Sequence, residues 1–186
     1  MGLVLTAWAA ARRPAAFVPL YLASVALDGV DGWVARRLGQ TSRFGAWLDV
    51  VVDNLSRGML WSLLGEWGWL VSATEWCVFV CNHSTRGASW KSDFTSSPRW
   101  VQAVMANGFR TPLGAWVIGG IHCLPLWLYG IRWDLLSHPL NLPPWLQALG
   151  TLVLAVGRLL GLSVEMWCIW AHIKYLTADE MEEKKD

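Results

Sequence analysis

Long apolar runs with few charges dominate this sequence of 186 residues. The runs cover residues 14–34, 44–64, 67–80, 113–129 and 145–173. A hydrocarbon core about 30 Å thick needs roughly 20 apolar residues in one helix, so each run predicts a membrane-spanning helix, in some cases short or tilted. Residues 1–11 are also apolar but span only about half that depth. We therefore expect an all-α, polytopic membrane helix bundle with five full spans and a shortened first span.

The composition agrees with a membrane protein. Charged residues make up 16% of the chain and the net charge is +1, whereas about 25% charged residues is usual in soluble domains. This excludes a disordered chain and argues against a nucleic-acid partner, which usually requires a basic excess. The 15 tryptophans favour a membrane interface, where an indole ring with one wet edge is useful.

The distribution of basic residues predicts an orientation. If the 14–34 helix ends on the cytosolic side, ten basic residues face the cytosol and three face the opposite side, which is the usual positive-inside bias. The cytosolic ten are Arg36, Arg37, Arg43, Arg86, Lys91, Arg99, Arg110, Lys174, Lys184 and Lys185. We expect a membrane domain over residues 1–176, one sizeable cytosolic loop over 83–110, and a charged cytosolic tail over 177–186.

Four aspartates interrupt two of the apolar runs. Asp28 and Asp31 are three apart, and Asp49 and Asp53 are four apart, so each pair shares one helix face. A short link joins the two helices, which makes them antiparallel neighbours and brings the four carboxylates together near the cytosolic surface. Carboxylates at this depth are costly unless they are neutralised, and an all-oxygen donor set suits Mg²⁺ or Mn²⁺. Structural ion pairs with arginines such as Arg57 are the alternative.

The residues between the two acidic pairs suit a phosphate-bearing ligand. Gly32 leaves the helix face bare, and Arg36 lies four residues further on the same face. Ser42 offers a hydroxyl, and Gly45 precedes Asp49 by four residues. Guanidinium and hydroxyl groups beside a divalent cation are typical of phosphate binding.

The segment DGVDGWVARRLGQTSRFGAWLDVVVD, residues 28–53, resembles the signature of the CDP-alcohol phosphotransferase family, D-x2-D-G-x2-A-R-x8-G-x3-D-x3-D. The residues in register are Asp28, Asp31, Gly32, Ala35, Arg36, Gly45, Asp49 and Asp53. The resemblance implies a six-helix membrane enzyme, usually a homodimer. Such an enzyme transfers the phosphoalcohol part of a CDP-alcohol to a second alcohol and releases CMP.

The resemblance also implies roles for the acids. Asp28, Asp31, Asp49 and Asp53 correspond to the ligands of Mg²⁺ or Mn²⁺. Asp53 is similar to the catalytic carboxylate that takes the proton from the attacking hydroxyl.

Further positions carry over to the CDP-linked lipid. Gly32, Arg36 and Ser42 correspond to contacts with that lipid. Ala35 and Gly45 correspond to positions of close packing around the nucleotide.

Within the family, the stretches SRFGAWLDVVVDN and CNHSTRGASWKSD resemble eukaryotic phosphatidylinositol synthases. This likeness implies CDP-diacylglycerol and myo-inositol as substrates, and an endoplasmic reticulum membrane with the active site facing the cytosol. Arg86, Lys91 and Arg110 are candidates for the acceptor pocket. Contact with anionic lipid headgroups is the alternative for Arg86 and Lys91.

Two other functions remain open at this point. The same chemistry could serve another acceptor, such as glycerol phosphate, choline or ethanolamine. The resemblance also departs at the front, because no Pro-Asn element precedes Leu3. This departure favours the alternative of a shortened, non-catalytic relative that dimerises with an active subunit.

Overall fold

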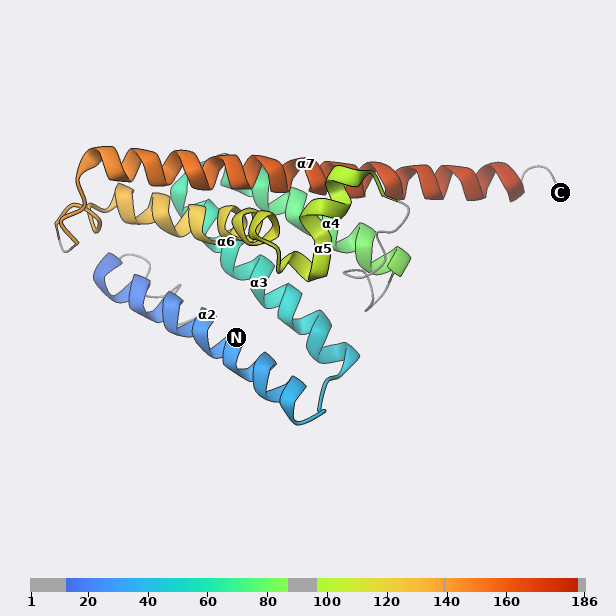
Figure 1. Cartoon of the computed structure of the whole chain (residues 1–186), viewed down its shortest axis with the longest axis horizontal. Coiled ribbons are helices and arrows are strands. Elements are labelled where there is room, and N and C mark those ends of the chain that lie inside the picture. Colours follow the sequence, from blue (N-terminus) through green and yellow to red (C-terminus); the bar gives the residue numbers. More distant parts are fainter. Residues whose placement is uncertain (1–12, 87–96, 139, 184–186) are drawn as a thin grey trace. The chain divides into compact units, whose positions relative to one another are not determined.

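The computed structural model describes residues 13–86, 97–138 and 140–183, except the side chains of residues 15, 84–86 and 178–183. These residues form helices, turns and short linkers and contain no strand, so the all-α prediction is confirmed for them (Figure 1). The helices are α2 (Pro14–Arg37), α3 (Arg43–Leu64), α4 (Gly68–Arg86), α5 (Arg99–Phe109), α6 (Pro112–Arg132) and α7 (Pro144–Glu183).

Every apolar run of the sequence coincides with a helix. Among the described residues, three helical stretches are long and apolar enough to cross a membrane: Ala16–Arg37, Pro112–Arg132 and Pro144–Thr177. Helix α3 carries two aspartates and two arginines within its 22 residues, and these charges lower its mean hydropathy. The structure thus supports an integral membrane protein with three such helices, and the expected five full spans are not confirmed. The shortened first span, expected over 1–11, lies outside the described residues.

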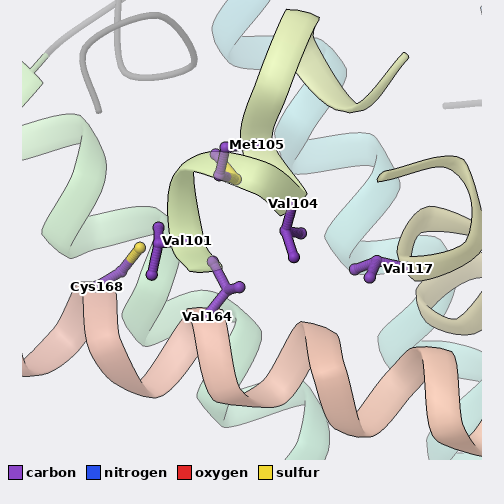
Figure 2. Close-up of a cluster of buried hydrophobic side chains, with 6 residues drawn as sticks. All are labelled: Val101, Val104, Met105, Val117, Val164 and Cys168. Atoms are coloured by element: carbon purple, nitrogen blue, oxygen red, sulfur yellow. The ribbon is translucent and has the colours of Figure 1, made fainter. Parts of the chain in front are cut away.

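The stretch 83–110, expected to be a loop, contains the helix α5. Val101, Val104 and Met105 follow a spacing of three and four residues, so they share one helix face, and all three are buried. They pack in a cluster with Val117 of α6 and two residues of α7, Val164 and Cys168 (Figure 2). This cluster stabilises α5, because so short a helix is only marginally stable in water by itself. The backbone of α5 leaves the helical conformation at Ala106, Asn107 and Gly108.

The chain divides into two compact units. The first unit combines the described residues up to Trp69 with Pro125–Ala148, and the second combines Leu70–Leu124 with the residues from Leu149 onward. The division within α6 falls at Pro125, which lies in the helix interior. A proline there has no N–H to donate to the preceding turn.

The first unit has its core at one end of the α2–α3 pair. Phe17 of α2, Leu60 of α3 and Tyr129 of α6 are fully buried, and the Phe17 and Tyr129 rings lie 4.7 Å apart between centroids. Nη1 of Arg132 donates hydrogen bonds to the carbonyls of Leu63 and Leu64. The last carbonyl groups of a helix have no hydrogen-bond partner within the helix, and the Arg132 guanidinium supplies one at the end of α3. The core therefore fixes the end of the pair opposite to the four aspartates.

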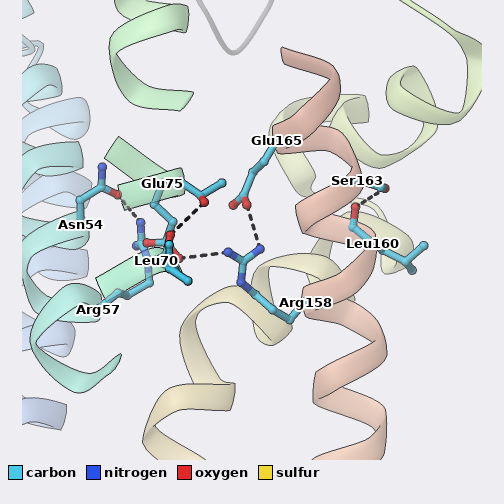
Figure 3. A network of polar contacts seen from close by, with 9 residues as sticks. Asn54, Arg57, Leu70, Glu75, Arg158, Leu160, Ser163 and Glu165 are labelled. Carbon is cyan, nitrogen blue, oxygen red and sulfur yellow. Dashed lines mark hydrogen bonds and ion pairs between the residues drawn. The ribbon is translucent and has the colours of Figure 1, made fainter. Parts of the chain in front are cut away.

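In the second unit, buried charged residues join α4 and α7. Nη1 of Arg158 lies 2.9 Å from Oε2 of Glu165, and Nη2 lies 3.6 Å from Oε1 of Glu75 (Figure 3). All three side chains are buried. Buried charges are tolerated where they are paired in this way.

Candidate active site

The helices α2 and α3 bring the four aspartates into one neighbourhood of the first unit. Residues 38–42 connect the helices. Asp28 on α2 lies close enough to Asp49 on α3 for the two carboxyl groups to interact electrostatically, and it interacts in the same way with Asp31 and Asp53. We call these four side chains the acidic cluster. Its existence follows from the spacings of three and four residues on two helices joined by a short link.

The acidic cluster is open to its surroundings. Asp31 and Asp49 are exposed, and Asp28 and Asp53 are half-buried. Among the described residues, no three His, Cys, Asp or Glu side chains are grouped tightly enough to hold a metal ion as they stand. The donors are nevertheless all carboxylate oxygens, and Asp28 of α2 lies close enough to Asp49 of α3 to interact with it electrostatically. This donor set fits a hard divalent cation once the carboxylates turn toward it, so the metal-ligand role stays a prediction.

Asp53 has a cationic neighbour on its own helix. Nη1 of Arg57 lies 3.7 Å from Oδ2 of Asp53. Nη2 of Arg57 donates a hydrogen bond to Oδ1 of Asn54 (Figure 3). The Arg57 side chain is 8% exposed, whereas that of Asp53 is 39% exposed. The alternative of an ion pair with Arg57 therefore holds for Asp53. Within the described part of the chain, no such pair is formed by the other three acids.

Gly32 and Arg36 lie together on α2. A Cβ atom at Gly32 would stand 3.2 Å from Nη1 of Arg36, so the missing side chain lets the guanidinium lie along the helix face. Arg36 is exposed, and Ala35 beside it is half-buried. An exposed guanidinium one helical turn from Gly32 is available to an anionic ligand.

Ser42 and Gly45 form the beginning of α3. Oγ of Ser42 accepts a hydrogen bond from the backbone N–H of Gly45, 2.9 Å away, and so caps the helix. A Cβ atom at Gly45 would lie 3.1 Å from that oxygen. The structure thus gives both residues a local role in starting the helix that carries Asp49 and Asp53. Their expected contacts with a CDP-linked lipid stay predictions.

The candidates for the acceptor pocket belong to another part of the chain. Arg110 is exposed and follows α5 in the second unit. Arg86 ends α4, but its side chain is outside the described part, and Lys91 lies outside the described residues altogether. Their role in binding an acceptor stays a prediction.

Asn54 was missed by the sequence analysis. It is 3% exposed and lies on the buried face of α3 together with Ser56, Arg57 and Leu60. The available signal was its position directly after Asp53 and three residues before Arg57, the spacing at which an amide oxygen can reach a guanidinium.

Comparison with known proteins agrees with this geometry. Residues 1–88 match the model of the CDP-alcohol phosphatidyltransferase family, and this segment contains the whole acidic cluster. The resemblance to the CDP-alcohol phosphotransferase family is confirmed. No solved structure matches the chain.

The similar proteins differ in the acceptor that their names give. The chain is 50% identical over 50 residues to CDP-diacylglycerol–inositol 3-phosphatidyltransferase 1 of Arabidopsis thaliana, covering 27% of this chain and 22% of that protein. It is 41% identical over 68 residues to the corresponding protein of Saccharomyces cerevisiae, covering 37% and 29%. It is 27% identical to CDP-diacylglycerol–serine O-phosphatidyltransferase of Mycobacterium tuberculosis, over 92% of this chain and 70% of that protein. The chain thus spans less than a third of the inositol transferases it matches.

Proposed function

We propose that this protein transfers the phosphatidyl group of CDP-diacylglycerol to myo-inositol, releasing CMP and forming phosphatidylinositol. The observation that carries the proposal is the acidic cluster itself. Carboxyl groups of two helices meet in a segment that matches the family model, next to an exposed guanidinium and a bare glycine. Packing between two apolar helices does not require four acidic residues, whereas binding the cations that accompany a pyrophosphate-bearing substrate does.

The proposed cofactor is Mg²⁺ or Mn²⁺, held by Asp28, Asp31, Asp49 and Asp53. When bound, such a cation neutralises the pyrophosphate and the leaving CMP. Asp53 accepts the proton of the attacking inositol hydroxyl. The hydroxyl oxygen forms a bond to the phosphatidyl phosphorus, the bond from that phosphorus to the bridging oxygen breaks, and CMP leaves with the bridging oxygen.

The residues beside the acidic cluster hold the substrate in this proposal. Arg36 pairs with the pyrophosphate, and Gly32 lets the ligand and the guanidinium approach the helix. Ala35 and Gly45 allow close packing around the nucleotide, and Ser42 contacts the CDP-linked lipid. Arg86, Lys91 and Arg110 are the proposed contacts of the acceptor.

The depth of the acidic cluster supports a site at the membrane surface. The Arg37 guanidinium lies 5.2 Å from the ring centroid of Trp33, and Trp33 is 53% exposed, a pairing that suits the headgroup region. At a rise of about 1.5 Å per residue, Asp31 lies about 3 Å and Asp28 about 7.5 Å from the level of Trp33 along the helix. Both acids are therefore within reach of a water-soluble acceptor.

The place in the cell is part of the proposal. The bias of ten basic residues against three supports an active site that faces the cytosol. For this site we propose the endoplasmic reticulum membrane and a homodimer, both on the family likeness.

The choice of inositol rests on where the similarity is concentrated. The identity of 50% with the Arabidopsis thaliana inositol transferase falls within 50 residues. Serine is the second candidate acceptor, because the Mycobacterium tuberculosis serine transferase aligns with 92% of the chain.

A CMP-release assay on the full chain in lipid vesicles tests the proposal. The vesicles contain CDP-diacylglycerol, and inositol, serine or glycerol phosphate is added with Mg²⁺ or Mn²⁺. Release that depends on inositol and on the metal supports the proposal. Release with serine alone would assign the second acceptor. Binding of the CDP-lipid with Mn²⁺ but no release with any acceptor would instead identify a non-catalytic relative.

A further inference from the structure

Arg57 is the one buried cation in contact with the acidic cluster among the described residues. It lies one helical turn after Asp53, on the face of α3 that packs into the first unit. We propose that Arg57 is a positioning residue for Asp53 and that Asn54 in turn holds Arg57. This inference rests on the proposed function, in which Asp53 accepts the proton of the attacking hydroxyl.

The geometry of the guanidinium supports this role. Its two terminal nitrogens are used differently: Nη1 faces Oδ2 of Asp53 at 3.7 Å, and Nη2 donates to Oδ1 of Asn54. Because the guanidinium is planar and rigid, fixing one nitrogen on Asn54 also fixes the direction of the other. The carboxylate of Asp53 is thus held on one side while its other side stays open, with 39% of the side chain exposed.

The hydrogen bonding of Asn54 points the same way. The amide Nδ2 is buried and has no hydrogen-bond partner in the described part of the chain. A buried donor without a partner costs free energy. If the amide were flipped, however, its N–H₂ group would face the guanidinium in place of Oδ1, and a guanidinium can only donate hydrogen bonds. The orientation of Asn54 therefore follows the need of Arg57 for an acceptor.

A purely stabilising role explains less of this arrangement. Ion pairs that must be desolvated are weak sources of stability compared with apolar residues of the same size. The arginine is also always charged, so it biases the neighbouring carboxylate permanently. The positive charge of Arg57 beside Asp53 weakens the binding of a metal cation by the acidic cluster. This loss of affinity is reasonable if Arg57 orients the carboxylate that reacts.

The test combines two measurements on the full chain in detergent micelles or vesicles. Mn²⁺ binding is followed by electron paramagnetic resonance with the metal alone, and CMP release is measured with CDP-diacylglycerol, inositol and Mn²⁺. For Arg57→Gln we expect Mn²⁺ to bind about three- to tenfold more tightly, because one positive charge is removed beside the acidic cluster. We expect kcat to fall about 10- to 100-fold in the same variant, since a small displacement of a reacting group has effects of that size.

Two further variants separate charge from position. Arg57→Lys keeps the charge but loses the planar fork, so Mn²⁺ affinity stays within twofold of wild type while kcat falls severalfold. Asn54→Ala leaves the charges unchanged and removes the hydrogen bond between residue 54 and the guanidinium, so we expect the same result: unchanged Mn²⁺ affinity and a lower kcat. In each variant the KM for CDP-diacylglycerol stays within about twofold, because the contacts expected for the lipid lie on other residues.

Arg13→Gln is the matched control for charge removal. Arg13 is exposed at the start of α2, fifteen residues before Asp28, which is about 22 Å along the helix. That distance exceeds the Debye length of about 8 Å at physiological ionic strength, so neither measurement should change.

The inference is overturned if Arg57→Gln leaves kcat within twofold of wild type, or if it weakens Mn²⁺ binding and lowers the melting temperature together. The second result would identify a structural residue. If wild-type protein binds Mn²⁺ but releases no CMP with any acceptor, the proposed function fails. The Mn²⁺ affinities then still decide whether Arg57 acts on the acidic cluster electrostatically.

Discussion

Two neighbouring glycines of α6 differ sharply in their surroundings, and this difference predicts opposite effects of the same substitution. A Cβ atom built at Gly119 meets nothing within 4 Å. At Gly120 it would stand 2.3 Å from the backbone nitrogen of Arg158 and 2.5 Å from the carbonyl carbon of Gly157, both on α7. The helices α6 and α7 therefore touch through Gly120 within the second unit.

The expected free energies follow from these distances. Alanine is favoured over glycine in a helix by up to about 1 kcal/mol, and both substitutions receive this gain. At Gly120 the new methyl group is about 1 Å closer to the α7 backbone than the optimal separation of about 3.5 Å. Overpacking of this kind costs about 1–3 kcal/mol, so Gly120→Ala should be less stable than Gly119→Ala by that amount. For a chain of this length, 1 kcal/mol corresponds to about 2–4 °C in melting temperature.

Thermal unfolding in detergent micelles, followed by circular dichroism, measures the difference directly. Gly119→Ala should melt at or slightly above the wild-type temperature, and Gly120→Ala should melt about 2–12 °C below Gly119→Ala. The reciprocal variant Gly157→Ala should resemble Gly120→Ala, because its Cβ would lie 2.7 Å from the carbonyl oxygen of Trp116. Equal melting temperatures for Gly119→Ala and Gly120→Ala would refute the close approach of α6 and α7.

The other predictions concern charge and capping. Asp53→Asn should abolish CMP release while the protein still binds CDP-lipid; loss of folding would argue for a structural role instead. Arg158→Leu leaves two buried carboxyl groups without their cation and should destabilise the chain by about 3–5 kcal/mol, read as a lower melting temperature; a melting temperature equal to wild type would contradict the buried network. Ser42→Ala removes the cap of α3 and should cost about 1 kcal/mol, and Ser42→Asn should restore it. If Ser42→Ala instead raises only the KM for CDP-diacylglycerol, the hydroxyl serves the lipid and not the helix.

The sequence predicted the helices well because apolar runs and helices coincide in a membrane protein. The starts of α2 and α3 lie within one residue of the runs that predicted them. The helix α5 was missed because the polar residues around it suggested a loop, although Val101, Val104 and Met105 already had helical spacing. Single-chain hydropathy emphasises long runs and overlooks a short amphipathic helix whose partners are distant in sequence.

The proximity of Asp28 to the other three aspartates could be predicted because it depends only on local geometry. Two helices joined by residues 38–42 must be neighbours, and spacings of three and four residues align each pair of acids on one face. The role of Asn54 depended on burial, which the sequence does not state. An asparagine on the exposed face of α3 would hydrogen-bond to water and would not hold the Arg57 guanidinium.

The choice of acceptor alcohol depends on residues other than the four aspartates. In the proposed function, the segment from Asp28 to Asp53 serves the part of the reaction that all CDP-alcohol substrates share, since each presents a pyrophosphate. To discriminate between the two acceptors, a site needs side chains that match either the hydroxyl groups of inositol or the charged groups of serine. Inositol is neutral, so an arginine can serve it only as a hydrogen-bond donor, whereas serine carries a carboxylate with which the arginine also forms an ion pair. If Arg110 contacts the acceptor, Arg110→Gln should therefore weaken the use of serine more than the use of inositol, and competition between the two acceptors in the CMP-release assay would measure it.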